Sequence, residues 1–197
     1  GWVGTPIMKL LTGENPYQVP CHLFGFPENE DPLSLSKFEQ LSGTVPCFTN
    51  LADLDNIIHT LCLAYEAFKK KFGQTPYLAL AAKHGNTCGF GADWENPQIA
   101  LEKALFGNST AIWGGEFVCN FPITDSLAKL LYESDAREKT VGSGWWMLDL
   151  VAAPSFSSEA LAVLGQKKDR KLMLNESLAE PQVSNSTVSF RPVRGGF

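Results

Sequence analysis

The strongest constraint on the fold of this chain is a long helical pattern that is followed closely by a buried strand. Apolar side chains recur with a helical period over residues 54–72, Asn50 or Asp53 is the expected N-terminal cap, and Gly73 is a stop signal. The apolar run YLALAA at 77–82 is typical of a buried strand. This succession predicts a sheet that is covered by helices.

Helical and extended patterns continue to alternate along the rest of the chain. Residues 1–48 are rich in Pro and Gly, which predicts a loop-rich N-terminal segment packed on a body formed by residues 49–197. Strands that alternate with helices indicate an α/β layered domain. We expect further helices at 96–107, from Thr124 or Asp125 onward and at 157–168, and extended segments at 109–113, 116–120, 145–153, 171–175 and 187–193.

Charge and hydropathy exclude two classes of partner. The formal net charge is −5, and no cluster of Lys and Arg in the sequence offers a nucleic-acid surface. The basic runs at 69–71 and 166–171 are interpreted as solvated faces. No apolar run approaches a membrane-spanning length. We therefore expect a protein that binds neither nucleic acid nor a membrane.

The five cysteines are odd in number and irregularly spaced, without a Cys-x-x-Cys pair. This pattern favours reduced thiols over a disulfide framework. The N-terminal stretch GWVGTPIMKLL lacks the charged region and long apolar core of a secretory signal. Both observations predict a cytoplasmic protein.

The stretch KHGNTCG at 83–89 places a lysine and a histidine in a loop where a buried strand ends. In an open α/β sheet, ligands gather at such strand ends. Histidine is the usual general base near neutral pH, and the Lys83 cation disfavours a second positive charge on His84. Lys83 can also stabilise an oxyanion that forms at a carbonyl carbon. The residues alone leave a second interpretation open, an exposed strand end without chemistry.

Cys88, in the same stretch, has three possible roles. A nucleophilic thiolate would need a base such as His84, four residues away. A deaminase-type zinc site expects His-x-Glu and a later Pro-Cys-x-x-Cys, and neither motif occurs in the sequence. The role that we expect is that of a small buried hydrophobic residue, and we expect no metal site.

Two further candidate sites are a pair of glycines beside a tryptophan and an acid inside an apolar run. Trp113, Gly114 and Gly115 would let the backbone approach a flat heterocycle that stacks on the indole, or they form a simple glycine turn. Asp149 lies inside the run WWMLDLVAA, where a carboxylate needs a partner. That partner is either a ligand or a donor from the protein itself.

Six stretches resemble, in the same order, motifs of the transformylase domain of the bifunctional enzyme AICAR transformylase/IMP cyclohydrolase, where AICAR is aminoimidazole carboxamide ribonucleotide. The central one is KHGNTCG, which is similar to the family pattern K-H-x-N-P-C-G. The others are LLTGENPYQ (10–18), similar to L-R-Y-G-E-N-P-H-Q; CFTNLADLDN (47–56), similar to S-Y-N-N-L-L-D-x-D; TAIWGGEFVCN (110–120), similar to S-A-F-G-G-I-I-A-F-N; LDLVAAPSFSSEALAVL (148–164), similar to D-x-I-I-A-P-x-Y-x-x-E-A-L; and VRGGF (193–197), similar to V-R-G-G-L.

The resemblance implies a cytidine-deaminase-like layered sandwich, in which a mixed sheet is flanked by helices. It also implies transfer of a formyl group from 10-formyltetrahydrofolate to the amine of a small-molecule acceptor of the aminoimidazole carboxamide type or a related one. Carried over motif by motif, the catalytic residues are Lys83 and His84. The implied substrate-binding residues are Asn50, Asp149, Thr12 and Gly13, and the implied folate-binding residues are Trp113, Gly114 and Gly115.

The chain also departs from the family pattern. Leu11 stands where the family has an arginine that meets the nucleotide phosphate, and leucine cannot bind a phosphate. The family's transformylase has two similar halves, and the resemblance covers the first. A homodimer, or a hetero-oligomer with a chain resembling the other half, is therefore expected to complete the site. The alternatives are a non-catalytic partner subunit that binds a folate or nucleotide, and a fragment of a longer enzyme.

Overall fold

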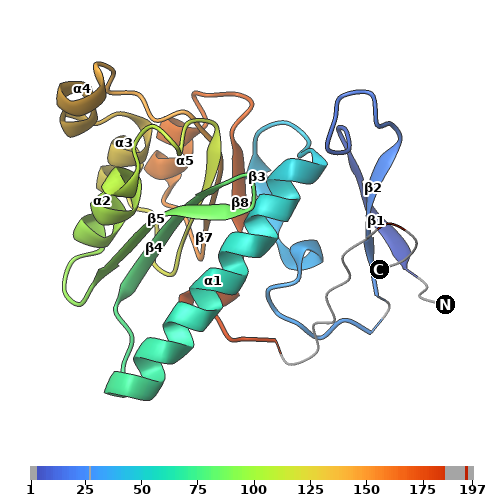
Figure 1. The fold of residues 1–197 in the computed structure, drawn as a ribbon, viewed down its shortest axis with the longest axis horizontal. Coiled ribbons are helices and arrows are strands. Elements are labelled where there is room, and N and C mark those ends of the chain that lie inside the picture. The colour runs from blue at the N-terminus through green and yellow to red at the C-terminus, as the bar shows by residue number, and fades with distance from the viewer. Residues whose placement is uncertain (1–3, 27, 185–193, 195–197) are drawn as a thin grey trace.

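The computed structural model describes residues 4–26, 28–184 and 194, and its body is a six-stranded mixed sheet with helices on both faces (Figure 1). The strand order is β3-β8-β7-β6-β4-β5. β6, β7 and β8 are parallel, whereas β4 is antiparallel to both of its neighbours and β3 is antiparallel to β8. The predicted mixed sheet flanked by helices is confirmed. The strands are β3 (Glu39–Ser42), β4 (Tyr77–Lys83), β5 (Asn86–Asp93), β6 (Gly115–Cys119), β7 (Leu148–Ala153) and β8 (Lys171–Leu174).

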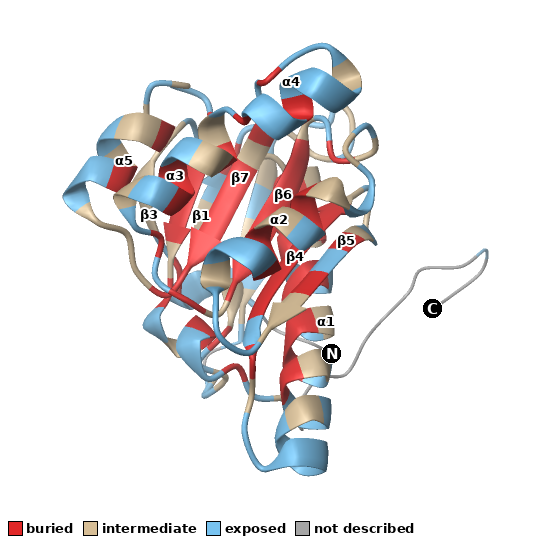
Figure 2. Ribbon diagram, turned by 90° about the vertical axis from the view of Figure 1, so that its left-hand side faces the viewer, coloured by how far each residue is buried: buried red, intermediate tan, exposed pale blue. Residues whose placement is uncertain are grey.

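The sheet separates two apolar cores, because successive side chains of a strand point to opposite faces. Ala79 and Ala81 of β4 contribute to a core with α2, α3 and α5, which Figure 2 shows together on one side of the buried strands. Leu78 and Leu80 of the same strand contribute to the core that α1 covers. The helices are α1 (Phe48–Phe72), α2 (Pro97–Gly107), α3 (Asp125–Tyr132), α4 (Asp135–Val141) and α5 (Ser158–Leu164), with short 3-10 turns η1 (Leu35–Lys37) and η2 (Glu176–Ala179).

The long helix α1 begins earlier than predicted. Cys47 is its N-cap, and the side chain of Asn50, within the first turn, accepts the Cys47 N–H at 3.2 Å. The prediction that Asn50 or Asp53 is the N-terminal cap is therefore wrong. Gly73 ends the helix with a φ of 73°, as predicted. The lysines at 69–71 are exposed, which confirms the interpretation of that run as a solvated face.

The N-terminal residues contribute to two different sheets. β1 (Thr5–Leu10) and β2 (Cys21–Gly25) form a separate antiparallel pair, which lies to one side of the body (Figure 1). β3 belongs instead to the main sheet, as an edge strand beside β8. Within the part of the chain that the structure describes, no helix combines the length and the apolar character that crossing a bilayer requires.

Several predicted boundaries differ from the observed ones. Residues 109–113 form turns and are not extended, because the Asn108 side chain accepts the Ala111 N–H at 2.9 Å and bends the chain between α2 and β6. The helix predicted at 157–168 ends at Leu164, the strand predicted at 145–153 begins at Leu148, and α4 was not predicted. The strand predicted at 187–193 lies outside the described residues.

Candidate active site

Lys83 and His84 lie where β4 turns back into β5. Lys83 pairs with Asn86, so His84 and Gly85 form a two-residue hairpin turn with φ values of 54° and 72°. Two consecutive positive φ angles are typical of a type I′ turn, which suits glycine and tolerates histidine or asparagine. The prediction of a loop over 83–89 is therefore wrong, because β5 begins at Asn86. The structure leaves His84 exposed and Lys83 half-buried.

A buried carboxylate on α1 holds this hairpin turn. Asp53 Oδ2 accepts the backbone N–H of His84 at 2.9 Å, and Asp53 Oδ1 accepts the backbone N–H of Gly85 at 2.5 Å. The Asp53 side chain is buried, so water competes little for these charge-assisted hydrogen bonds. The helix α1 thereby fixes His84 relative to the sheet.

Asn50 lies about one turn before Asp53 on α1 and reaches the sheet. Its Nδ2 donates to Oε1 of Glu116, on β6, at 3.0 Å, while its Oδ1 accepts the Cys47 N–H. Asn50 and Glu116 are both buried. The amide expected to bind the substrate therefore has protein partners at both ends, and a ligand would have to compete with Glu116 for the Nδ2 donor.

Glu116 is an acid at the start of an otherwise apolar strand. Burial raises its pKa to about 9; the Asn50 amide lowers the pKa, whereas the Asp53 and Asp149 carboxylates raise it. At neutral pH Glu116 is therefore a neutral carboxylic acid that can donate an O–H. Its Oε2 atom is buried and has no hydrogen-bond partner among the described residues.

Three of the predicted site residues converge at Gly114. Lys83 Nζ donates a hydrogen bond to the backbone oxygen of Trp113. A Cβ atom built on Gly114 would lie 3.4 Å from Lys83 Nζ and 3.9 Å from Asp149 Oδ2. The structure thus gathers a cation from the end of β4, a glycine from the turn before β6 and an acid from β7.

Asp149 has a donor from the protein itself. Lys167 Nζ lies 2.9 Å from Asp149 Oδ1, and the lysine side chain is largely buried. This ion pair confirms the prediction that a carboxylate inside this apolar run has a partner. The Asp149 oxygen that lies near Gly114 is the other one, Oδ2.

Trp113 presents an indole at the surface beside this group. Its side chain is 47% exposed, and the Arg137 guanidinium carbon lies 5.4 Å from its ring centroid. The guanidinium also lies 4.9 Å from the Trp146 ring, so it is held between two indoles. The exposed part of the Trp113 ring offers a flat apolar surface on which another ring could stack.

Thr12 and Gly13 approach the start of α1. The Phe48 N–H donates to the Thr12 backbone oxygen at 3.0 Å, and the Gly13 N–H donates to the Gln18 backbone oxygen at 2.9 Å. The segment after β1 is therefore tied to the first turn of the helix that carries Asn50. The structure brings the two N-terminal site residues to the same end of α1 as the rest.

Cys88 is half-buried and packs against one of the apolar cores. Burial raises the pKa of its thiol, so a thiolate nucleophile is disfavoured at neutral pH. All five cysteines lie among the described residues and are free thiols. Within the described ranges, no group of three His, Cys, Asp or Glu side chains is arranged to hold a metal ion.

The basic run at 166–171 is a solvated face only in part, because Lys168 is exposed but the other cations are not. Arg170 and Lys171 are buried, and Lys167 forms the ion pair with Asp149. The interpretation failed because α5 ends before the run begins. The last two cations lead into β8, and their side chains are buried because that strand lies within the sheet.

Sequence reasoning missed three members of this group, namely Glu116, Asp53 in its role at the turn, and Lys167. Glu116 offers a usable signal, an acid that follows two glycines and opens an apolar strand, which is the kind of signal that singled out Asp149. Asp53 and Lys167 offer none, because their roles depend on which elements pack together.

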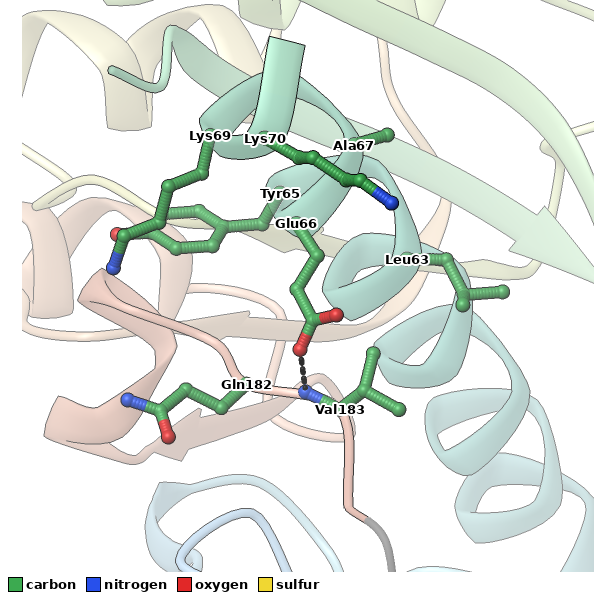
Figure 3. Close-up of a pocket in the computed structure, with 8 residues that line it drawn as sticks. All are labelled: Leu63, Tyr65, Glu66, Ala67, Lys69, Lys70, Gln182 and Val183. Atoms are coloured by element: carbon green, nitrogen blue, oxygen red, sulfur yellow. Dashed lines mark hydrogen bonds between the residues drawn. The ribbon is translucent and has the colours of Figure 1, made fainter. Parts of the chain in front are cut away.

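A separate hollow of about 660 Å³ lies on the outer face of α1, away from these residues (Figure 3). Lys69 and Lys70 border it, and the Glu66 carboxylate accepts the Val183 N–H there at 3.0 Å. The residues predicted from the sequence to form the site do not line this hollow. The candidate site is therefore defined by the convergence of side chains at the opposite end of α1.

The sequence profile of the family described as AICARFT/IMPCHase bienzyme matches residues 4–197. The chain belongs to this family. The match extends over all six stretches that carried the resemblance, including those with Asn50, Lys83 and Asp149.

This AICARFT/IMPCHase family member is similar to curated relatives described as "Bifunctional purine biosynthesis protein PurH". The relative from Staphylococcus carnosus is 32% identical over 188 residues, which make up 95% of this chain and 32% of that protein. The relative from Oceanobacillus iheyensis is 30% identical over 179 residues, which make up 91% of this chain and 30% of that protein. The chain thus spans about a third of the length of these relatives.

Two solved structures resemble the AICARFT/IMPCHase family member more distantly. RibD of Acinetobacter baumannii, form 2, has a TM-score of 0.42 at 13% identity, over 64% of this chain and 38% of that chain. The dCMP deaminase of cyanophage S-TIM5, in complex with dCMP and dUMP, has a TM-score of 0.39 at 15% identity, over 60% of this chain and 93% of that chain. The family assignment rests on the sequence match.

Proposed function

We propose that this AICARFT/IMPCHase family member is the first half of a transformylase. It would move a formyl group from 10-formyltetrahydrofolate to the amine of an aminoimidazole carboxamide-type or related acceptor. The observation that carries the proposal is the convergence of Lys83 and Asp149 at Gly114, beside the turn that Asp53 holds and that carries His84.

His84 is the general base of the proposed reaction. The acceptor amine is a poor nucleophile because its lone pair is conjugated with the carboxamide, so a base must remove its proton as it attacks. The imidazole is exposed, and its backbone is anchored by Asp53. A base that is accessible to the ligand but fixed in position satisfies both requirements of the step.

Lys83 is the electrostatic group of the same reaction. Its ammonium stabilises the negative charge that develops on the formyl oxygen during attack. When the tetrahedral intermediate collapses, the bond between the formyl carbon and N10 breaks, and tetrahydrofolate leaves with the proton that His84 took from the amine. 10-Formyltetrahydrofolate supplies the formyl group, and the exposed Trp113 indole would stack against its heterocycle. Asp149, paired with Lys167, is available through its other oxygen to accept a hydrogen bond from the acceptor.

A second polypeptide completes the proposed site. The curated relatives are about three times as long as this chain, and the family's transformylase has two similar halves. A homodimer or a hetero-oligomer with a chain like the other half would cover the exposed His84 and Trp113. The five free thiols suit the reducing cytoplasm, which is the location that we propose.

The replacement His84→Asn is expected to lower the rate of formyl transfer by about 100-fold or more, because it removes the general base. Asn-Gly is the preferred pair for a type I′ turn, so the hairpin should stay at least as stable as before. The measurement is tetrahydrofolate production from 10-formyltetrahydrofolate and AICAR by the full natural protein, together with its thermal unfolding midpoint.

The matched control is His59→Asn, which alters an exposed histidine on α1 and should leave the rate unchanged. Transfer at the wild-type rate by the His84→Asn protein would refute His84 as the base. Binding of the folate by a wild-type assembly that transfers no formyl group would favour the non-catalytic partner subunit instead.

One structural observation supports an acceptor without a phosphate. Leu11, which replaces the arginine of the family pattern, lines a hollow of about 620 Å³ together with Leu10, Val19 and Val45. Lys9 also borders this hollow, but its lining is mainly apolar. An apolar lining disfavours a phosphate dianion, which needs charged or N–H donors.

The replacement Leu11→Arg is therefore expected to tighten the binding of AICAR, which carries a phosphate, by about tenfold through a charge-assisted hydrogen bond. Isothermal titration of the full natural protein with AICAR and with its phosphate-free riboside measures the effect. Leu11→Gln, which adds length without charge, is the control. An equal gain for both ligands, or no gain for either, would contradict the idea.

A further inference from the structure

Glu116 is a buried acid at a position where the family pattern has an apolar residue. In the stretch TAIWGGEFVCN it follows the two glycines, where the pattern S-A-F-G-G-I-I-A-F-N has isoleucine. The side chain is only 2% exposed. A buried carboxyl group is costly unless it is protonated or paired, so this departure from the pattern calls for a compensating interaction.

The surroundings of Glu116 supply one partner and lack another. Asn50 donates to Oε1 at 3.0 Å, whereas Oε2 has no partner among the described residues. Asp53 lies one turn beyond Asn50 on α1, and its carboxylate raises the pKa of the Glu116 carboxyl group. Two ionised carboxylates cannot bond to each other, but one shared proton makes an O–H···O bond between them.

Two acids from different elements favour the protonated form of Glu116. Asp53 on α1 and Asp149 on β7 both raise the pKa of Glu116. These nearby acids therefore disfavour ionisation of Glu116. On β5, burial raises the pKa of the Cys88 thiol, Glu116 also raises it, and the Lys83 ammonium of β4 lowers it. Asp53 accepts the two backbone N–H groups of the turn at the same time.

We propose that Glu116 is a positioning residue that shares one proton with Asp53 and thereby holds the His84 turn against α1. In the protonated pair, Glu116 donates to Asp53, and Asp53 accepts from the turn as well. Loss of that proton would leave two carboxylates in contact. Their repulsion would weaken the hydrogen bonds that Asp53 accepts from the His84 and Gly85 amides. The catalytic consequence rests on the proposed function, whereas the carboxyl pair itself does not.

The direct test is an NMR titration of the full natural protein, labelled with 13C-glutamate and 15N, from pH 6 to 10.5. The Glu116 carboxyl carbon and the His84 and Gly85 amides are expected to share one inflection near pH 9. The Glu116→Gln protein should lack the amide inflection, because its neutral amide can donate to Asp53 and accept from Asn50 at every pH. Separate inflections in the wild type, or an inflection that persists in Glu116→Gln, would overturn the proposal.

Stability gives a second readout that needs no activity. Because the folded chain raises the pKa of Glu116 from its ordinary value of 4.5 to about 9, the stability that protonation contributes is complete below 4.5 and is lost as pH rises toward 9. Relative to Glu116→Gln, the wild type should lose unfolding stability steadily over this interval and level off above it. Parallel profiles of the two proteins would contradict the shared proton.

The consequence for transfer is tested with two variants at pH 8. Glu116→Leu removes both hydrogen bonds and should lower kcat about tenfold, and Glu116→Gln should restore most of that loss. A lower melting temperature with unchanged kcat in Glu116→Leu would reduce Glu116 to a structural role and refute the positioning role. If the shared inflection is present but the wild type transfers no formyl group, the proposed function is disproved and the carboxyl pair is not. If the wild type transfers the formyl group but shows no shared inflection, only the carboxyl pair is disproved.

Discussion

Replacing Arg170 with methionine is expected to lower the free energy of unfolding by about 3–5 kcal/mol, because each buried carbonyl oxygen left without a donor costs about 1–3 kcal/mol. Arg170 is 1% exposed. Its Nε donates to the Leu148 oxygen at 3.0 Å and its Nη2 to the Trp146 oxygen at 2.9 Å. Methionine has a similar volume but no donors, so these buried carbonyl oxygens would lose their partner.

Urea unfolding of the Arg170→Met protein, followed by circular dichroism, measures this loss. Lys168→Met is the matched control, because Lys168 lies in the same basic run but is exposed, and its change should stay within about 0.5 kcal/mol. Arg170→Lys should recover only part of the stability, since one ammonium cannot reproduce the planar fork of a guanidinium. Equal losses for Arg170→Met and Lys168→Met would show that the buried network contributes nothing.

The replacement Gly91→Ala is expected to cost about 3 kcal/mol or more, at the upper end of the range for overpacking. A Cβ atom built on Gly91 would lie 1.8 Å from the Ala100 oxygen and 2.9 Å from the Ala104 nitrogen. Both atoms belong to the backbone of α2, so neither can swing aside as a side-chain end could. The helix α2 would have to move away from β5 and from the core beneath it.

The control for this substitution is Gly73→Ala, at the end of α1. Gly73 also needs glycine, for its φ of 73°, but a Cβ atom there would meet no atom within 4 Å. Its loss should be about 1 kcal/mol, the cost of a left-handed residue alone. Thermal unfolding of both variants separates the steric cost from the conformational one, and a Gly91→Ala loss no larger than that of Gly73→Ala would show that α2 yields easily.

Much of the fold could be predicted because its signals are local. The helical period over 54–72 and the apolar run at 77–82 reflect burial of one helix face and of a central strand, and both elements are present. The turns at 109–113 were missed because their cause is a single side chain, Asn108, that bonds the backbone in place of a strand partner. Such a bond leaves no periodic trace in the sequence.

The candidate site divides in a similar way. Lys83, His84 and Asp149 were identified from residue types and from motif order, and Asp149 was expected to need a partner. That the partner is Lys167 could not be predicted, because the two residues meet only when the segment after α5 packs beside β7. For the same reason Asp53 was interpreted as a helix cap, although it binds the hairpin turn 31 residues further along the chain.

The alternating α/β pattern, the family and the types of group available for chemistry can be predicted from the sequence, because periodicity and motif order are properties of neighbouring residues. Which of those groups meet, and which are charged, depends on how the helices pack on the sheet. Glu116 shows the reason: its pKa depends on burial and on carboxylates contributed by α1 and β7. The carboxylates come close to Glu116, and Glu116 becomes buried, only when the helix packs on the sheet.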